Sequence, residues 1–140
     1  MSPFSHLLHA IRSSRGICQS ELSDLIGYEQ TYISSLETGR KGPPPKEFID
    51  RLAKTLNLSA DEHAQLIEAA NASNRKFMIE KDVPLDVYWL FSDLRNRQLE
   101  LSPIQVRLIR DVISIKETLA AQPEYPVQQI RRRKNREVHM

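Results

Sequence analysis

Cysteine and glycine are scarce in this sequence, and their scarcity excludes several kinds of site. Among 140 residues there are one cysteine, Cys18, and four glycines. A single cysteine forms neither an internal disulfide nor a multi-cysteine zinc site, so a reducing compartment, the cytoplasm, fits best. The glycines make neither a GxGxxG nor a GxxxxGK[ST] pattern, so the two common nucleotide-cradling loops are missing.

Long apolar runs and a strong charge of one sign are missing too. No run approaches the roughly 18 apolar residues of a membrane-spanning helix, and the N-terminus, MSPFSHLLHAIRSSRG, lacks the features of a secretory signal. We therefore expect no membrane partner. Because 20 Lys and Arg stand against 18 Asp and Glu, any contact with nucleic acid must come from local placement of charge.

The sequence also lacks clear sets of catalytic or metal-binding residues. No Ser/His/Asp or Cys/His set has a supporting pattern, so we expect neither an enzyme nor a cofactor. His6 and His9 could share a metal, but no third ligand is apparent. Cys18 could be a redox sensor, although a small, half-buried residue is the better interpretation because no second cysteine is present.

Apolar residues recur every three or four positions, which predicts an all-α protein. The positions expected to line five short helices are Leu7, Leu8 and Ile11; Leu22, Leu25 and Ile26; Ile33 and Leu36; Phe48, Ile49, Leu52 and Leu56; and Leu66, Ile67 and Ala70. Gly27 and Gly39 should end the second and third helices, and Ser59 with Glu62 has capping-box spacing. We place the end of this domain, residues 1–72, at the polar segment 71–76.

A helical hairpin is predicted over residues 77–121. Its first helix spans residues 86–101, and Ser102-Pro103 should begin a longer helix that ends near Ala121. Residues 122–140 form a basic tail that we expect to be mobile. The tail is either simply solvated or becomes ordered on DNA or on a partner.

The aromatic residues of the hairpin point to different sides of their helix. They belong either to a small local core or to a subunit interface, where Trp and Tyr are enriched. We favour the interface, because a two-helix hairpin has too little core to stand alone. The residues expected at this interface are Tyr88, Trp89, Phe91, Ile109 and Val112.

The segment from Cys18 to Pro44, CQSELSDLIGYEQTYISSLETGRKGPP, carries the functional signal. Its two short helices share one apolar seam, formed by Leu22, Ile26, Ile33 and Leu36. The second helix then turns a short, polar, uncharged face outward, formed by Gln30, Thr31, Ser34 and Ser35. Such a helix fits a DNA groove about 12 Å wide and can offer hydrogen bonds to base edges.

This segment resembles the helix-turn-helix of the Cro/CI-type (XRE) family of phage-repressor-like regulators. The family signature is matched in register by Gln19, Leu22, Gly27, Ile33, Ser34, Glu37, Gly39, Arg40 and Pro43. The likeness covers about residues 4–70 and implies a five-helix lambda-repressor-like DNA-binding domain. Two departures are Cys18, where a capping Thr is usual, and Glu29, where a small capping residue is common. Glu29 either caps its helix or accepts a hydrogen bond from a cytosine amino group, and we favour capping.

The resemblance also implies the roles of individual residues. Base contacts are expected from Gln30, Thr31, Ser34 and Ser35. Phosphate contacts are expected from Gln19, Arg40, Lys41, Arg15 and Lys46. Arg12 and Glu37 are expected to pair as a structural brace between helices.

The sequence therefore predicts a sequence-specific DNA-binding transcriptional regulator, a dimeric repressor that recognises an inverted-repeat operator through the major groove. Its expected partners are double-stranded DNA and a second copy of the chain. Residues 1–75 hold eight basic and nine acidic side chains, so phosphate attraction rests on a few positioned groups. The alternative is an antitoxin-like or adaptor protein whose C-terminal half binds a partner protein, with DNA binding for autoregulation.

Overall fold

The computed structural model describes residues 1–119, and every regular element there is an α-helix. The all-α prediction is confirmed for this part of the chain. The chain divides into two compact units, the first Met1–Ile79 and the second beginning at Glu80. The expected basic tail, residues 122–140, lies outside the described residues.

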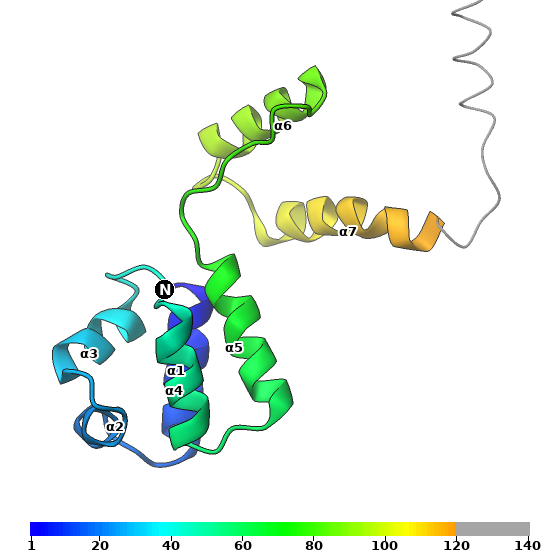
Figure 1. Cartoon of the computed structure of the whole chain (residues 1–140). Coiled ribbons are helices and arrows are strands. Elements are labelled where there is room, and N and C mark those ends of the chain that lie inside the picture. The colour runs from blue at the N-terminus through cyan, green and yellow to red at the C-terminus, as the bar shows by residue number, and fades with distance from the viewer. Residues whose placement is uncertain (120–140) are drawn as a thin grey trace, which may run out of the picture. The chain divides into compact units, whose positions relative to one another are not determined.

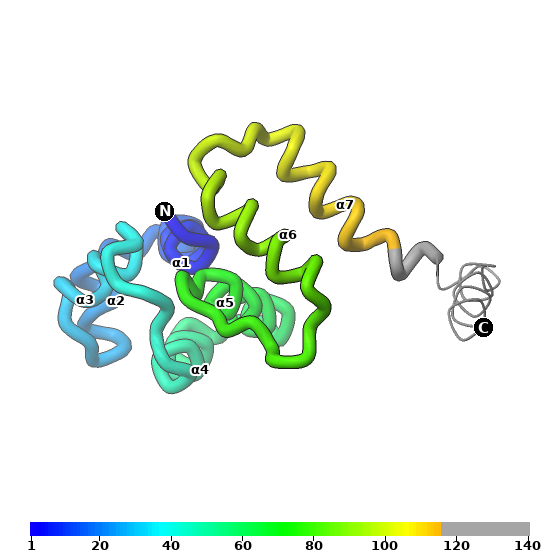
Figure 2. Tube along the Cα trace, turned by 90° about the horizontal axis from the view of Figure 1, so that it is seen from above, coloured from blue at the N-terminus to red at the C-terminus, as the bar shows by residue number. Residues whose placement is uncertain are grey.

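Five helices build the first unit. They are α1 (Pro3–Ser14), α2 (Gln19–Ile26), α3 (Gln30–Thr38), α4 (Lys46–Thr55) and α5 (Ala60–Ala72). Helix α1 packs against both α3 and α5, α2 packs against α3 and α4, and α4 packs against α5. In both Figure 1 and Figure 2, α2 and α3 lie next to each other at one end of this unit.

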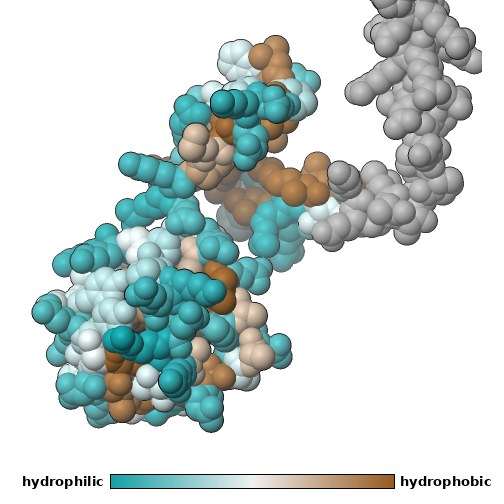
Figure 3. Space-filling model, viewed as in Figure 1, coloured by the Kyte–Doolittle hydropathy of each residue, from teal (hydrophilic) through white to brown (hydrophobic). Residues whose placement is uncertain are grey.

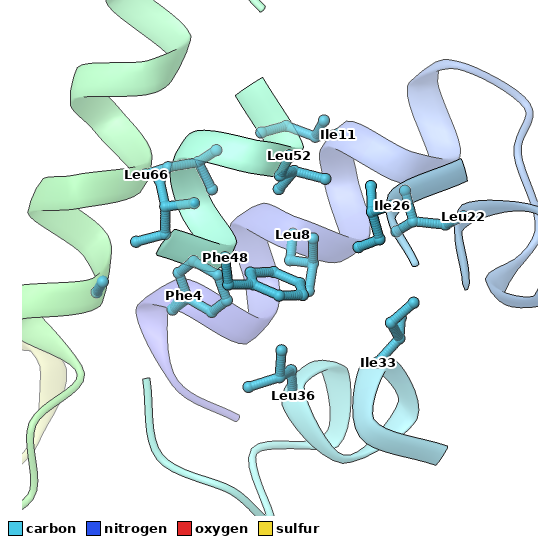
Figure 4. Packing of buried hydrophobic residues seen from close by; sticks show 12 residues of the cluster. Phe4, Leu8, Ile11, Leu22, Ile26, Ile33, Leu36, Phe48, Leu52 and Leu66 are labelled. Carbon is cyan, nitrogen blue, oxygen red and sulfur yellow. The ribbon is translucent and has the colours of Figure 1, made fainter. Parts of the chain in front are cut away.

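All five helices contribute side chains to one hydrophobic core (Figure 4). Its buried members are Phe4, Leu8, Ile11, Leu22, Ile26, Ile33, Leu36, Phe48, Ile49, Leu52, Leu66 and Ala70. The expectation for Leu25 is wrong, because this side chain is 54% exposed. Helices α3 and α4 cover only the face of α2 that carries Leu22 and Ile26, so Leu25 is left to solvent.

Local signals set the helix ends. Gly27 and Gly39 end α2 and α3 in the left-handed conformation, with φ of 73° and 76°. Ser59 and Glu62 form the predicted capping box at the start of α5. Ser2 caps α1 in the same way, and Pro3 is the first residue of that helix.

Residues 71–76, where we expected the domain boundary, belong to the first unit. Helix α5 continues to Ala72. The hydroxyl of Ser73 accepts a hydrogen bond from the backbone N–H of Phe4 at 2.9 Å. The guanidinium of Arg75 donates to the carbonyl oxygen of Gly39 at 2.8 Å. These bonds fasten the segment to α1 and to the end of α3.

The second unit contains α6 (Leu85–Asn96) and α7 (Pro103–Leu119). As predicted, α7 begins at Pro103 after Ser102, whereas α6 ends five residues earlier than expected. The two helices make few contacts with each other, and no residue of α6 is buried. Figure 3 shows hydrophobic side chains at the surface of this unit. None of the helices in the described part of the chain is long and apolar enough to cross a membrane.

Candidate nucleic-acid interface

A tightly held turn joins α2 to α3. After the left-handed Gly27, the hydroxyl of Ser23 donates to the carbonyl oxygen of Tyr28. The guanidinium of Arg51, on α4, donates to the carbonyl oxygen of Ile26 at 3.3 Å. Because α2 and α4 both hold the turn, the direction in which α3 leaves it is fixed.

The apolar seam of α2 and α3 is buried as the sequence predicts. Leu22, Ile26, Ile33 and Leu36 are at most 2% exposed. On the other side of α3, Gln30 and Thr31 are exposed, and Ser34 and Ser35 are half-buried. The seam therefore determines which face of α3 points outward.

The outward face of α3 carries hydrogen-bonding groups without net charge. The hydroxyl of Ser35 donates to the carbonyl oxygen of Thr31 at 2.8 Å, and that of Thr38 donates to the carbonyl oxygen of Ser34 at 3.0 Å. These donors are satisfied within the helix, so the hydroxyl oxygens remain as acceptors. Within the described chain no hydrogen bond is recorded for the Gln30 amide, which leaves both its donor and its acceptor exposed.

Glu37, on the inner side of α3, joins three helices. The residue is 6% exposed, and its carboxylate accepts from Arg12 of α1 through Nε at 2.6 Å and Nη2 at 3.1 Å. It also accepts from Nε2 of Gln19, on α2, at 2.7 Å. Arg12 further donates to the carbonyl oxygen of Ile17 at 2.8 Å. This Arg12–Glu37–Gln19 network fixes α3 against α1 and α2.

The network keeps Glu37 ionised. Burial by itself raises the pKa of the Glu37 carboxyl, but the hydrogen bonds from Arg12 and Gln19 lower it, and the resulting pKa lies below the ordinary value. The bond to Glu37 raises the pKa of Arg12 in turn. Both groups are therefore charged at neutral pH, and each compensates the burial of the other.

The basic residues expected at phosphates lie in different surroundings. Arg40 and Lys41 are exposed just beyond the end of α3, and Lys46 is exposed at the start of α4. Arg15 instead forms an ion pair with Glu62 of α5, with an Nη2–Oε2 distance of 3.3 Å. Arg15 therefore links α1 to α5, while the other three cations are exposed, two directly after α3 and one at the start of α4.

Two tyrosines that our sequence reading missed lie beside the outward face of α3. The rings of Tyr28 and Tyr32 stack with centroids 5.6 Å apart. Each also packs edge-on against the buried ring of Phe48, at 4.9 Å and 5.7 Å. Burial raises the pKa of Tyr32, with the neighbouring Tyr28 adding to the effect. Tyr28 lies in the turn before α3 and Tyr32 in its first turn, so the pair of aromatic residues next to the predicted helix start was the available signal.

A surface hollow of about 280 Å³ lies next to these rings. It is lined by Tyr28, Glu29, Thr31, Tyr32, Ser35 and Lys41. Nζ of Lys41 lies 5.2 Å from the centroid of the Tyr32 ring, within cation–π range. The hollow thus combines an aromatic wall, an anion, a cation and two hydroxyls on the side of α3 that faces outward.

The residues that depart from the family pattern at helix starts do not act as side-chain caps. Glu29 occupies the N-cap position of α3, and Cys18 that of α2, but neither side chain accepts a capping hydrogen bond. Glu29 therefore has the expected N-cap position but forms no side-chain cap hydrogen bond, and its carboxylate stays exposed. Cys18 is exposed rather than half-buried. Among the described residues, no three His, Cys, Asp or Glu side chains are grouped as metal ligands.

Comparison with known proteins agrees with this geometry. Residues 3–66, a little under half of the chain, match a family model described as a helix-turn-helix domain. No match to the chain was found among curated proteins or solved structures. The matched residues contain α2, the turn and α3, with the packing partners α1 and α4, in agreement with the Cro/CI-type resemblance. Residues 3–66 are thus similar to helix-turn-helix domains, which suggests a DNA-binding regulator.

Proposed function

We propose that this protein is a sequence-specific transcriptional repressor that binds DNA as a dimer, with α3 in the major groove. The observation that supports this most directly is the fixed orientation of α3. Its inner side is held by the Arg12–Glu37–Gln19 network, and its outer side carries exposed, uncharged hydrogen-bonding groups. A helix held in this way can meet base edges without losing much conformational freedom on binding.

Base recognition is assigned to the outward face of α3. The free amide of Gln30 can pair with N6 and N7 of adenine, the usual bidentate match for this side chain. Thr31 adds a hydroxyl and a methyl group, and the latter suits the methyl group of thymine. Ser34 and Ser35 lie one turn further along the helix and are only half-exposed, so we assign them a smaller share.

Phosphate binding is assigned to Arg40, Lys41 and Lys46. All three are exposed, and no ion pair in the described structure includes them. They follow the C-terminal end of α3, so they can meet the phosphates that border the groove while α3 lies within it. Gln19 and Arg15 are weaker candidates, because Gln19 is bonded to Glu37 and Arg15 is paired with Glu62.

The dimer is assigned to the second unit. Tyr88, Trp89 and Val112 are exposed there, and Phe91 and Ile109 are half-buried. No side chain of α6 is buried, and none of the described side chains of α7 is buried either. A second copy that covers the exposed apolar residues would supply the missing hydrophobic burial. A two-fold dimer places two recognition helices about 34 Å apart, or a multiple of that, which requires an inverted-repeat operator. Repression then follows from occupying promoter DNA.

The experiment that tests this function is selection of bound sites from random DNA duplexes with the full-length protein. We expect an enriched inverted repeat whose half-sites are about one helical turn apart, or a multiple. Sedimentation of the complex should give two chains per site. Equal, weak affinity for every duplex would contradict the proposal.

A second candidate is an antitoxin-like or adaptor protein. The exposed apolar side chains of α6 and α7 favour it as well, because a different protein could cover them. The two candidates differ in the purified chain alone. A stable homodimer supports the repressor, whereas a monomer that becomes compact only with a stoichiometric partner supports the adaptor.

A further inference from the structure

The hollow beside the N-terminal half of α3 has a wall that is fixed by the core. Tyr28 and Tyr32 stack on each other, and both rest edge-on against Phe48, which is fully buried. The guanidinium of Arg51 lies over the ring of Tyr28, 5.3 Å from its centroid. A rigid aromatic wall of this kind can hold a flat or apolar group in one place.

The carboxylate of Glu29 lies at this hollow without a strong partner of its own. It accepts no capping hydrogen bond from α3, and within the described chain it accepts one long hydrogen bond, from the hydroxyl of Thr31 at 3.5 Å. An ionised carboxylate only accepts hydrogen bonds. Glu29 therefore offers acceptor capacity to a donor that comes from outside the protein.

Among the four bases, cytosine suits such a group best. In the major groove cytosine presents the N4 amino donor and no acceptor, whereas guanine presents two acceptors and thymine presents one. Adenine presents a donor beside an acceptor, so a carboxylate that approaches it meets repulsion from N7. A carboxylate at the groove edge thus attracts cytosine and disfavours the other three bases.

We propose that the hollow is a specificity subsite in which Glu29 accepts a hydrogen bond from the N4 amino group of a cytosine in the operator. The aromatic wall receives the neighbouring C5 edge of that base. Lys41, held over Tyr32 at the same hollow, contacts an adjacent phosphate and offsets the repulsion between Glu29 and the DNA backbone. This inference rests on the proposed DNA-binding function and adds the identity of one base.

The test compares three full-length proteins in selections from random duplexes, namely the wild type, Glu29→Gln and Asp24→Asn. Asp24 is exposed on α2 and does not line the hollow, so its variant is a matched loss of one negative charge. We expect the wild type to require cytosine at one position of each half-site. Glu29→Gln should reduce the preference for cytosine there about tenfold, with a shift towards adenine, because glutamine pairs with adenine.

The outcomes separate the subsite from the general function. Asp24→Asn should keep the wild-type base order at every position, although it raises affinity for all duplexes through its charge. If Glu29→Gln also keeps the wild-type order, or if no position of the wild-type site prefers cytosine, the subsite is refuted while sequence-specific binding stands. If the wild type selects no sequence at all, the proposed function itself fails.

Discussion

In the proposed function, recognition depends on single side chains rather than on net charge. The first 75 residues hold almost equal numbers of acidic and basic groups, so the net charge of this part does not by itself attract DNA. Instead, Gln30 is free on the outward face of α3, and three exposed cations follow the end of that helix. The consequences of removing these groups therefore differ from one residue to the next.

Replacing Gln30 with alanine should relax base preference at one position of the site. Loss of a good bidentate contact with adenine costs about 1–3 kcal/mol on the preferred duplex and little on random DNA. Competition binding with single-base variants of the selected site measures the change. Gln65→Ala, at an exposed glutamine on α5, is the control. An equal loss on cognate and random DNA would remove Gln30 from the base-reading set.

Replacing Arg40 or Lys41 with alanine should weaken binding to all sequences alike. Each phosphate contact that is lost should flatten the slope of log K against log salt by about one unit. Fluorescence titrations over a range of salt concentrations measure that slope. Lys54→Ala, at an exposed lysine on α4, should leave it unchanged. A variant that retains the wild-type slope has lost no phosphate contact.

Glu37→Gln should destabilise the first unit in a pH-dependent way. The pKa of Glu37 is lowered in the fold from its ordinary value of 4.5, so the ionised group stabilises the fold above about pH 4.5. This stabilisation is lost as the pH falls through the lower folded pKa. Urea unfolding should show a cost of about 3 kcal/mol at pH 7, with a smaller difference from wild type at pH 3. The exposed Glu68→Gln should show neither effect, and a pH-independent difference would refute this role of the charge.

At the scale of elements, the stability of the α2–turn–α3 segment depends on backbone conformation as well as on packing. Gly27 ends α2 at a φ of 73°, a region that costs residues with a Cβ atom about 1–2 kcal/mol. A Cβ atom built there would meet its nearest neighbour, Nη1 of Arg51, at 3.7 Å, an ordinary contact. The cost of a larger residue at this position is therefore backbone strain rather than a clash.

Gly27→Ala should accordingly lower the free energy of unfolding by about 1 kcal/mol. Gly42→Ala is a matched control, because Gly42 has no positive φ and its Cβ atom would meet nothing within 4 Å. Thermal unfolding followed by circular dichroism measures both variants. If both lose the same stability, the left-handed conformation of Gly27 is not the cause.

At the scale of the whole molecule, the two units differ in how they are stabilised. The first unit has a core built from five helices, whereas no side chain of α6 is buried in the second. Hydrophobic burial is the main favourable contribution to folding. The second unit is therefore expected to gain its stability from association, and the first is expected to keep its own.

Trp89→Ala should lower the dimer content of the full-length protein. Trp89 is 64% exposed in the single chain, and an exposed Trp is a typical centre of a subunit interface, where truncation often costs 2 kcal/mol or more. Sedimentation velocity over a range of concentrations measures the shift. Leu25→Ala, at an exposed apolar residue of the first unit, should leave the association constant unchanged. If Trp89→Ala remains as dimeric as the wild type, Trp89 is not at the interface.

The sequence predicts a helix end correctly where a residue at that end carries its own capping or turn chemistry. Gly27, Gly39, Ser59 and Pro103 each mark a helix end through their own backbone or side-chain chemistry, and the structure places the ends there. The helical period also identified most of the core. It misplaced Leu25, because the period alone does not show how far neighbouring helices cover a face.

The sequence by itself therefore determined the helices, the turn after Gly27 and the uncharged outward face of α3, since each depends on residues within a few positions of one another. Only the tertiary structure decided that Gln19 joins Arg12 at Glu37, that Arg15 is paired with Glu62, and that a hollow forms beside α3. These features need side chains from separate helices to meet. Their meeting depends on how the five helices pack around the shared core, which no single segment specifies.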